Sequence, residues 1–226
     1  MNPDLMRALG RLVRGLSALF WGLPATLVIC FHTAQAEAFR TFGIFPPLAC
    51  TGLLVYGLWL LGAFQKQERV WRNALDWARL LALINFGLSP FLYWSNRVPD
   101  NSFFWIMKLA MLLGGLMFLA SLNLVLKRLG AMLPDETLRL ETRQYTLLNL
   151  NLLLATAVLG AAYIVLGRRP DLPLYFQAVL LVMDRGSAWL LVLLVLLPLA
   201  MTMALLWKTK EVILESVFTA PHPPGP

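Results

Sequence analysis

The chain has 226 residues, of which 59% are apolar and 14% are charged, and its formal net charge is +7. A water-soluble fold of this length needs more polar surface than this composition supplies, which excludes a soluble globular protein. The basic residues flank apolar stretches and form no single stripe interleaved with aromatic residues, so the charge indicates contact with anionic lipid headgroups and not with nucleic acid.

Six uncharged or nearly uncharged stretches follow one another along the chain, and each is long enough to cross a bilayer. A helix needs about 20 apolar residues to span a hydrocarbon core of roughly 30 Å. We therefore predict an all-α polytopic transmembrane helical bundle, in which residues 1–218 form one membrane-embedded domain. The predicted spans cover approximately residues 16–36, 45–64, 79–97, 103–126, 144–167 and 186–207.

The first span has a second possible interpretation. Three arginines precede an apolar run that ends in the small-residue sequence at 34–36, a pattern typical of a cleaved secretory signal. Cleavage would leave five spans. We favour an uncleaved first helix, because Pro24 and His32 are unusual inside the apolar core of a signal.

The segment between the second and third spans, residues 67–79, has charged and apolar side chains on opposite sides at helical spacing. This pattern predicts an amphipathic helix that leads into the third span. Trp71 and Trp77 both suit a membrane interface, so we expect this helix to lie along the membrane surface. A docking helix for a cytoplasmic partner is the alternative.

The gap between the fourth and fifth spans carries signals for a helix end and a new helix start. Gly130 is expected to end the fourth helix, and Pro134 with Asp135 to start the next one. Glu136 then lies in a first turn, where negative charge is favourable. We interpret the segment as a solvated extension of the fifth span.

Two further segments are too short or too polar to cross. Residues 172–183 are apolar but number only twelve, so they predict an interfacial or re-entrant helix, or an outer extension of the sixth span. Residues 219–226 include four prolines and predict a mobile tail.

The distribution of Lys and Arg predicts the orientation. Thirteen of them lie before the first span, in the second and fourth gaps or after the sixth span, whereas only five lie in the other gaps. By the positive-inside rule, both termini lie in the cytoplasm. A bacterial cytoplasmic membrane is the expected location, because the chain has no long soluble domain or extended glycosylated loop.

Residues with catalytic or metal-binding chemistry are sparse. The two histidines are His32 and His222, and the second lies in the predicted tail, so one chain cannot build a bis-histidine haem site within the membrane. Cys30 and Cys50 lie in separate spans without a Cys-x-x-Cys pair. No phosphate-binding, zinc-protease or nucleophile-elbow motif is present. We therefore expect no enzymatic activity, no cofactor and no metal.

Four polar residues fall at similar predicted depth in the outer half of the bundle. They are His32, Asn96, Lys108 and Tyr163. If they converge, they form a polar pocket open to the outer side, in which Lys108 holds an anionic or zwitterionic group. The alternatives are that Lys108 extends to the outer headgroups and that His32 bonds to a neighbouring helix.

Polar residues also recur on one face of the third span, at Asn85 and Ser89, and of the fifth, at Asn149 and Thr156. Such stripes usually hold helices together through hydrogen bonds, so we interpret them as packing surfaces. Two functions agree with these features. One is an accessory or scaffold subunit of a membrane complex, with a protein partner or a second copy in the membrane. The other is a small carrier or substrate-binding component with a small molecule or lipid as its ligand.

Overall fold

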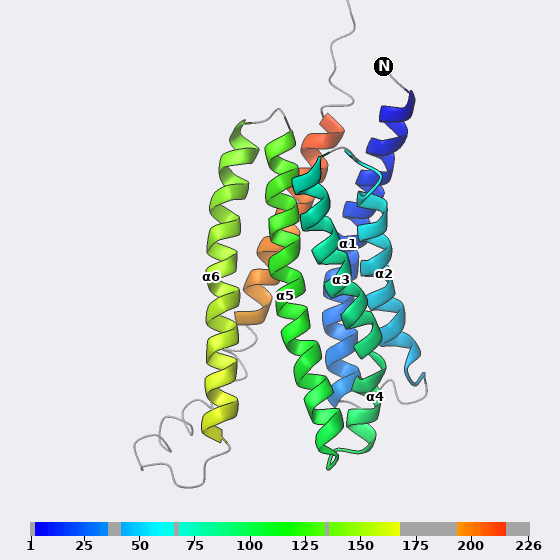
Figure 1. Ribbon diagram of the computed structural model, residues 1–226, viewed down its shortest axis with the longest axis vertical. Helices are drawn as coiled ribbons and strands as arrows, with labels where there is room; N and C mark the ends of the chain where they lie inside the picture. Colours follow the sequence, from blue (N-terminus) through cyan, green and yellow to red (C-terminus); the bar gives the residue numbers. More distant parts are fainter. Residues whose placement is uncertain (1–2, 36–41, 66–67, 134–135, 168–193, 216–226) are drawn as a thin grey trace, which may run out of the picture.

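The computed structural model describes residues 3–35, 42–65, 68–133, 136–167 and 194–215, and within these ranges the regular structure is entirely helical. The helices form one elongated bundle (Figure 1). Six of them are α1 (Pro3–Gln35), α2 (Phe45–Leu61), α3 (Arg69–Leu88), α4 (Pro90–Arg97), α5 (Ser102–Met132) and α6 (Glu136–Gly167). Residues 194–215 form a seventh, which we call the C-terminal helix.

The helices run along the long axis of the bundle, with α5 between two groups (Figure 1). Helices α3 and α4 pack against one side of α5, with α1 and α2 on the same side, and α6 packs on the other. The C-terminal helix crosses behind α5, and its Trp207 ring lies 5.5 Å from the Phe20 ring of α1, measured between centroids. The start of α1 and the last described turn of the C-terminal helix lie at the same end of the bundle. The ends of α2 and α5 and the starts of α3 and α6 lie at that end too, as the sequence predicts for the more basic side.

Three of the described helices are long and apolar enough to cross a membrane. These segments are Met6–Ala34 in α1, Ser102–Met132 in α5 and Arg139–Ala162 in α6. A fourth apolar helix, α2, is shorter at 17 residues. The structure thus confirms the all-helical bundle and is compatible with insertion in a membrane, while the number of six crossings stays a prediction.

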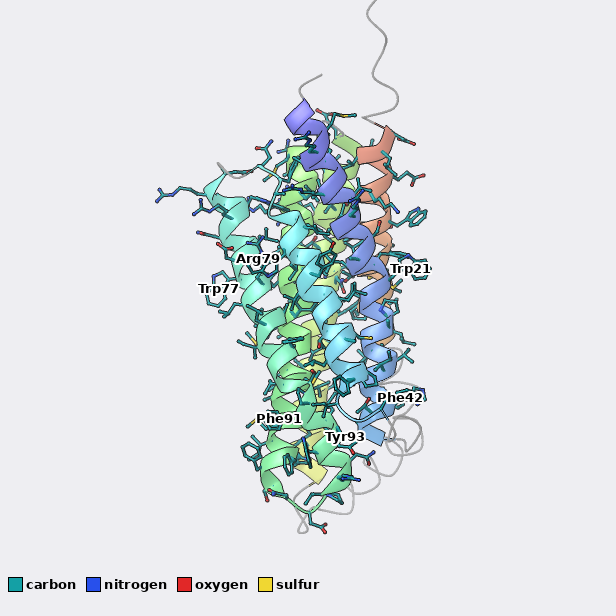
Figure 2. The ribbon with its side chains drawn as sticks, turned by 90° about the vertical axis from the view of Figure 1, so that its right-hand side faces the viewer. Trp21, Phe42, Trp77, Arg79, Phe91 and Tyr93 are labelled. Carbon is teal, nitrogen blue, oxygen red and sulfur yellow. The ribbon has the colours of Figure 1, made fainter. Side chains whose placement is uncertain are left out.

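The third predicted span differs from the prediction in two ways. The amphipathic segment and the span form one helix, α3, which packs against α2 and α5 and breaks only at Ser89. Trp71 is fully buried with its ring against Phe64, so its predicted interfacial position was wrong. Trp77 does project outward, as does Trp21 on α1 (Figure 2). The burial of Trp71 follows from its place on the face that α3 turns toward the core.

The break between α3 and α4 has a chemical cause. Pro90 has no N–H to donate to the Phe86 carbonyl, which lies four residues earlier. The Ser89 hydroxyl donates to this carbonyl instead, at 2.8 Å, and the Thr51 hydroxyl of α2 reaches Ser89 Oγ at 3.4 Å. The freed backbone group is therefore satisfied locally.

The end of α5 also differs from the prediction. The helix continues through Gly130 to Met132, so the expectation that Gly130 ends it was wrong. A Cβ at Gly130 would lie 3.2 Å from the hydroxyl oxygen of Thr142 on α6. This glycine therefore allows α5 and α6 to approach each other and does not act as a terminator. Glu136 lies in the first turn of α6, as expected, whereas Pro134 and Asp135, which were expected to start this helix, lie outside the described residues.

Helices α1 and α2 approach most closely at two glycines. A Cβ on Gly15 would lie 2.8 Å from the carbonyl oxygen of Gly57 and 2.4 Å from Leu61, whereas the reverse distance, from Gly57 to the Gly15 carbonyl oxygen, is 3.1 Å. Fully buried leucines, among them Leu16 and Leu58, surround this contact. Close backbone approach between small residues is the usual way to pack helices in lipid.

Arg79 joins α3 to the end of α2. Its guanidinium donates to the Leu58 carbonyl at 3.2 Å and pairs with Asp76 at the same distance. A Cβ at Gly62 would overlap this guanidinium, so the glycine leaves room for it.

The possible cleavage at 36, the segment 172–183 and the tail 219–226 lie outside the described residues.

Candidate functional site

The candidate site is a cavity of about 500 Å³ between α1 and α5, with further walls from α2, α3, α4, α6 and the C-terminal helix. On α1 its lining extends from Leu23 to Ala34, and on α5 from Trp105 to Leu119. The axial extent is therefore about 17 Å along α1 and about 20 Å along α5, at 1.5 Å per residue. Its volume falls within the range of small-molecule sites.

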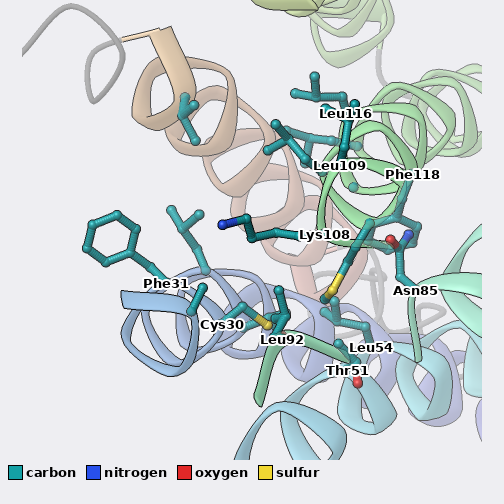
Figure 3. A pocket seen from close by; sticks show the side chains of 18 of the residues that line it. Cys30, Phe31, Thr51, Leu54, Asn85, Leu92, Lys108, Leu109, Leu116 and Phe118 are labelled. Atoms are coloured by element: carbon teal, nitrogen blue, oxygen red, sulfur yellow. The ribbon is translucent and has the colours of Figure 1, made fainter. Parts of the chain in front are cut away.

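The walls of the cavity are predominantly apolar. Leucine, phenylalanine, methionine and valine side chains make up most of them, and Lys108 is the one charged residue among the described residues that line it. Figure 3 shows Lys108 in the cavity, with its ammonium directed to the side on which Phe31 lies. Both side chains are exposed, as is Leu112, so the cavity reaches the surface of the bundle.

Two polar side chains of the wall already donate to backbone carbonyls. Thr51 donates to Pro47 at 2.7 Å, and the amide nitrogen of Asn85 donates to Leu81 at 2.9 Å. The side-chain oxygen of Asn85 is buried without a donor from the described residues, and it lies 2.7 Å from where Gly114 would carry a Cβ. The tight fit of Asn85 against Gly114 fixes the contact between α3 and α5.

The predicted pocket residues lie at one end of the bundle, but they do not share the cavity. Lys108 lines it, whereas His32 and Asn96 are not among its lining residues. His32 is exposed in the last turn of α1 with its ring against Phe31, and Asn96 donates to the Thr33 carbonyl at 3.4 Å. The side chain of Tyr163 lies outside the described part of the chain. A polar pocket built from the four residues stays a prediction.

The predicted stripe residues do contact neighbouring helices. The hydroxyl of Ser89 lies within hydrogen-bond distance of the Thr51 hydroxyl of α2, as described above. The hydroxyl of Thr156 lies 2.8 Å from the carbonyl oxygen of Leu152 and 3.1 Å from that of Leu194, and it shares its proton between them. Because Pro198 has no N–H to offer to Leu194, Thr156 of α6 supplies the missing donor to the C-terminal helix.

Asn149 belongs to a buried hydrogen-bond cluster, which we call the asparagine network. Its members are Asn123 of α5, Asn149 of α6, and Thr202 with Pro198 of the C-terminal helix. The Asn149 amide nitrogen lies 3.0 Å from Asn123 Oδ1, 2.9 Å from the Thr202 hydroxyl and 3.1 Å from the Pro198 carbonyl. Asn123 also donates to Thr202 at 2.9 Å. Asn123, Asn149 and Thr202 are all fully buried, so the network ties three helices together.

Sequence reasoning missed Asn123 and Thr202, which are isolated polar residues within long apolar runs. The signal was the isolation itself, since a lone polar side chain in a membrane span needs a partner on another helix. A second signal lies on α6, where Thr142, Thr146 and Asn149 share one helical face and are buried.

No family model matches the chain, and neither a curated protein nor a solved structure matches it.

Proposed function

We propose that the protein is a multi-pass integral membrane protein with six crossings and both termini in the cytoplasm, and that it acts without catalysis as an accessory or scaffold subunit of a membrane complex. The observation that carries membrane insertion is an inverted distribution of polarity. Large apolar side chains are exposed on the outside of the bundle, whereas amides and hydroxyls are buried between helices.

The inversion is clearest on α6. Leu154, Val158 and Val165 are more than half exposed, while Asn149 on the same helix is fully buried. In water this arrangement would expose apolar surface and desolvate amides. In lipid the apolar side chains meet hydrocarbon and the amides bond to each other.

The orientation is supported by the two ends of the bundle. At the end with the α1 start, α1, α3, α5, α6 and the C-terminal helix all carry Lys or Arg. At the opposite end, the described basic residues are Arg97 and Lys108. The positive-inside rule assigns the first end to the cytoplasm. For a bacterial cytoplasmic membrane the other end faces outward.

The topology is tested with single cysteines in a background where Cys30 and Cys50 are replaced by alanine. Asp100→Cys places a thiol in the α4–α5 turn, and Glu136→Cys places one at the start of α6. A membrane-impermeant maleimide should label the first in intact cells and the second only after permeabilisation. Labelling of both from the same side would show that α5 does not cross.

The subunit role is supported by the absence of catalytic motifs in the sequence and by the extent of exposed apolar surface. Its test is the mass of the full-length protein, purified in mild detergent and measured by light scattering with the detergent contribution subtracted. A complex larger than one 25.4 kDa chain, with fixed stoichiometry, agrees with the proposal. A single chain at every detergent concentration that keeps the protein folded contradicts it.

A second function, a ligand-binding membrane component, is favoured by the cavity between α1 and α5. The cavity has a volume of about 500 Å³, which falls within the range of small-molecule sites, and it is open to the surface of the bundle. A subunit that only packs against partners has no need of it.

A further inference from the structure

We propose that the cavity binds one hydrocarbon chain that carries an anionic head group, with the head at Lys108 and the chain extending along α1 and α5 toward Leu119. This proposal rests on membrane insertion and deepens the second function above, because it specifies the ligand class. It requires neither the subunit role nor a particular orientation.

The shape of the cavity favours a long, narrow ligand. Its lining extends over about four turns of α5, from Trp105 to Leu119, and about three turns of α1. A compact polar solute would occupy only part of this length. An extended chain can contact both helices over the full length.

The chemistry of the walls disfavours a ligand that is polar along its length. Leu27, Leu109, Leu116 and Phe118 offer only hydrocarbon, and the donor groups of Thr51 and Asn85 are bonded to backbone carbonyls. The buried polar atoms of the wall without a partner among the described residues are the Thr26 hydroxyl and Asn85 Oδ1. A buried hydroxyl or amide on the ligand would lose its hydrogen bonds to water and gain few in return. Methylene groups, in contrast, are stabilised when they leave water for such surroundings.

The charge lies toward one end. Lys108 is one turn from Trp105, where the lining of α5 begins, and eleven residues from Leu119, where it ends. No described acidic side chain forms an ion pair with it. An ammonium at the mouth of an apolar cavity favours a carboxylate or phosphate over an uncharged head, because charge-assisted hydrogen bonds are the stronger kind. The ligand is therefore an amphiphile whose head remains near the surface.

The cavity is reached from the side of the bundle. Phe31, Lys108 and Leu112 line it and are exposed at the same time, so the opening lies between α1 and α5 and not only at the end of the bundle. A lateral opening faces lipid in a membrane, where free fatty acids and lipids with one chain reside. Lys108 lies in the second turn of α5, close to the depth of the headgroups.

The structure offers a matched pair of variants to test occupancy. Gly115 lines the cavity, and a Cβ there would meet nothing within 4 Å; Gly160 on α6 has the same open surroundings but does not line the cavity. Gly115→Leu therefore adds a side chain to the cavity wall at a position with open space at its Cβ, and Gly160→Leu is its control. Both variants replace a helical glycine by leucine, so their effects on helix propensity are equal.

The probe is a palmitic acid analogue with a photoreactive diazirine on its chain, added to the full-length protein in phosphatidylcholine nanodiscs. After irradiation, peptide mass spectrometry locates the cross-links. We expect cross-links at lining residues of α1 and α5, reduced about tenfold in Gly115→Leu and unchanged in Gly160→Leu, where tenfold corresponds to about 1.4 kcal/mol of binding free energy. Equal labelling of both variants and the unsubstituted protein would overturn the proposal.

The charge is tested with the methyl ester of the same probe. We expect the acid to label about tenfold more than the ester, and Lys108→Gln to remove this preference, since hydrogen bonds between charged groups are stronger than those to a neutral ester. Lys127→Gln, on the same helix but outside the cavity lining, should retain it. Equal labelling by acid and ester in the unsubstituted protein would contradict an anionic head.

Two competitors distinguish the sources of an anionic amphiphile. Lysophosphatidylglycerol has one chain and a phosphate, and phosphatidylglycerol has two chains and the same head. If lysophosphatidylglycerol displaces the probe, the site accepts phosphate as well as carboxylate head groups. If only phosphatidylglycerol displaces it, the proposal of a site for a single chain is contradicted. The cysteine-labelling experiment tests membrane insertion independently of the cavity. If it gives the expected topology while Gly115→Leu has no effect on cross-linking, the cavity proposal is wrong and membrane insertion is unaffected.

Discussion

The two sides of α5 pack by different means. Toward α1 to α4, the bundle relies on close glycine contacts, as between Gly15 and Gly57, on buried leucines, and on apolar walls that leave a cavity. Toward α6 and the C-terminal helix, it relies on the asparagine network, beside one close glycine contact between Gly130 and Thr142. Lipid provides no hydrophobic drive for helices to associate, so both close contacts and hydrogen bonds are needed to hold them together. On the side of the asparagine network, hydrogen-bond partners therefore determine which helices pack together. On the side of the cavity, the fit between small and large side chains determines it.

The largest effect should come from the centre of the network. Asn149→Leu removes three hydrogen-bond contacts and leaves Asn123 Oδ1 without its donor, so we expect a loss of about 2 to 3 kcal/mol in the free energy of unfolding. Unfolding by sodium dodecyl sulfate in mixed micelles, followed by circular dichroism, measures it. Asn151→Leu is the control on the same helix, because Asn151 is exposed. Equal losses would show that the network contributes nothing specific.

The next effect should come from the close contact on the other side. Gly15→Ala places a Cβ against the Gly57 carbonyl, so α1 and α2 must separate, at a cost of about 1 to 3 kcal/mol. Gly10→Ala, where a Cβ meets nothing within 4 Å, should instead stabilise by up to about 1 kcal/mol through helix propensity. The same micelle titration reports both. Effects of the same sign would show that backbone approach does not limit this pair.

A smaller effect is expected for Thr202→Val, which keeps the shape and removes the hydroxyl shared by both asparagines. We expect a loss of about 1 to 2 kcal/mol. Thr209→Val is the control, because the Thr209 hydroxyl bonds only to Leu205 of its own helix among the described residues. If the control loses as much stability as Thr202→Val, the sharing between helices is not what stabilises the network.

The smallest effect should come from Lys108, which takes no part in the packing of either side. Lys108→Gln should change the free energy of unfolding by no more than about 0.5 kcal/mol, as for other exposed positions. Arg79→Gln should cost more, about 1 kcal/mol, because it breaks the bond to the Leu58 carbonyl. A large loss in Lys108→Gln would mean that the lysine supports the fold and is not reserved for a ligand.

Much of the fold could be predicted from the sequence, because long apolar runs in a chain with few charges have few alternatives to helices. Boundaries were less predictable. Gly130 is compatible with both a helix end and a close contact, and only the position of Thr142 on α6 decides between them. Trp71 likewise suits an interface or a core, and the face that α3 presents to α5 determines its burial.

The site was less predictable than the fold. The stripe of Asn149 and Thr156 was visible from its spacing. Asn123 has only Lys127 one turn away, at the charged end of its apolar run, and Thr202 has only Thr209 two turns away, so neither was recognised as part of a stripe. The cavity could not be predicted, because a leucine that lines a cavity and a leucine that packs in a core are indistinguishable in the sequence. Lys108 marked its location only because a cation is rare in such surroundings.

Thr156 has a consequence for how the chain is assembled. The Leu194 carbonyl has no donor within its own helix, because the residue four positions later, Pro198, lacks an N–H. It accepts from Thr156 of α6 instead. A C-terminal helix released alone into lipid would therefore keep an unpaired acceptor. The cost of that state favours delivery of this helix to the bilayer together with α6 during synthesis. The bond from Thr156 also fixes the axial position of the C-terminal helix. A shift of this helix by one turn would move the Leu194 carbonyl out of reach of the Thr156 hydroxyl.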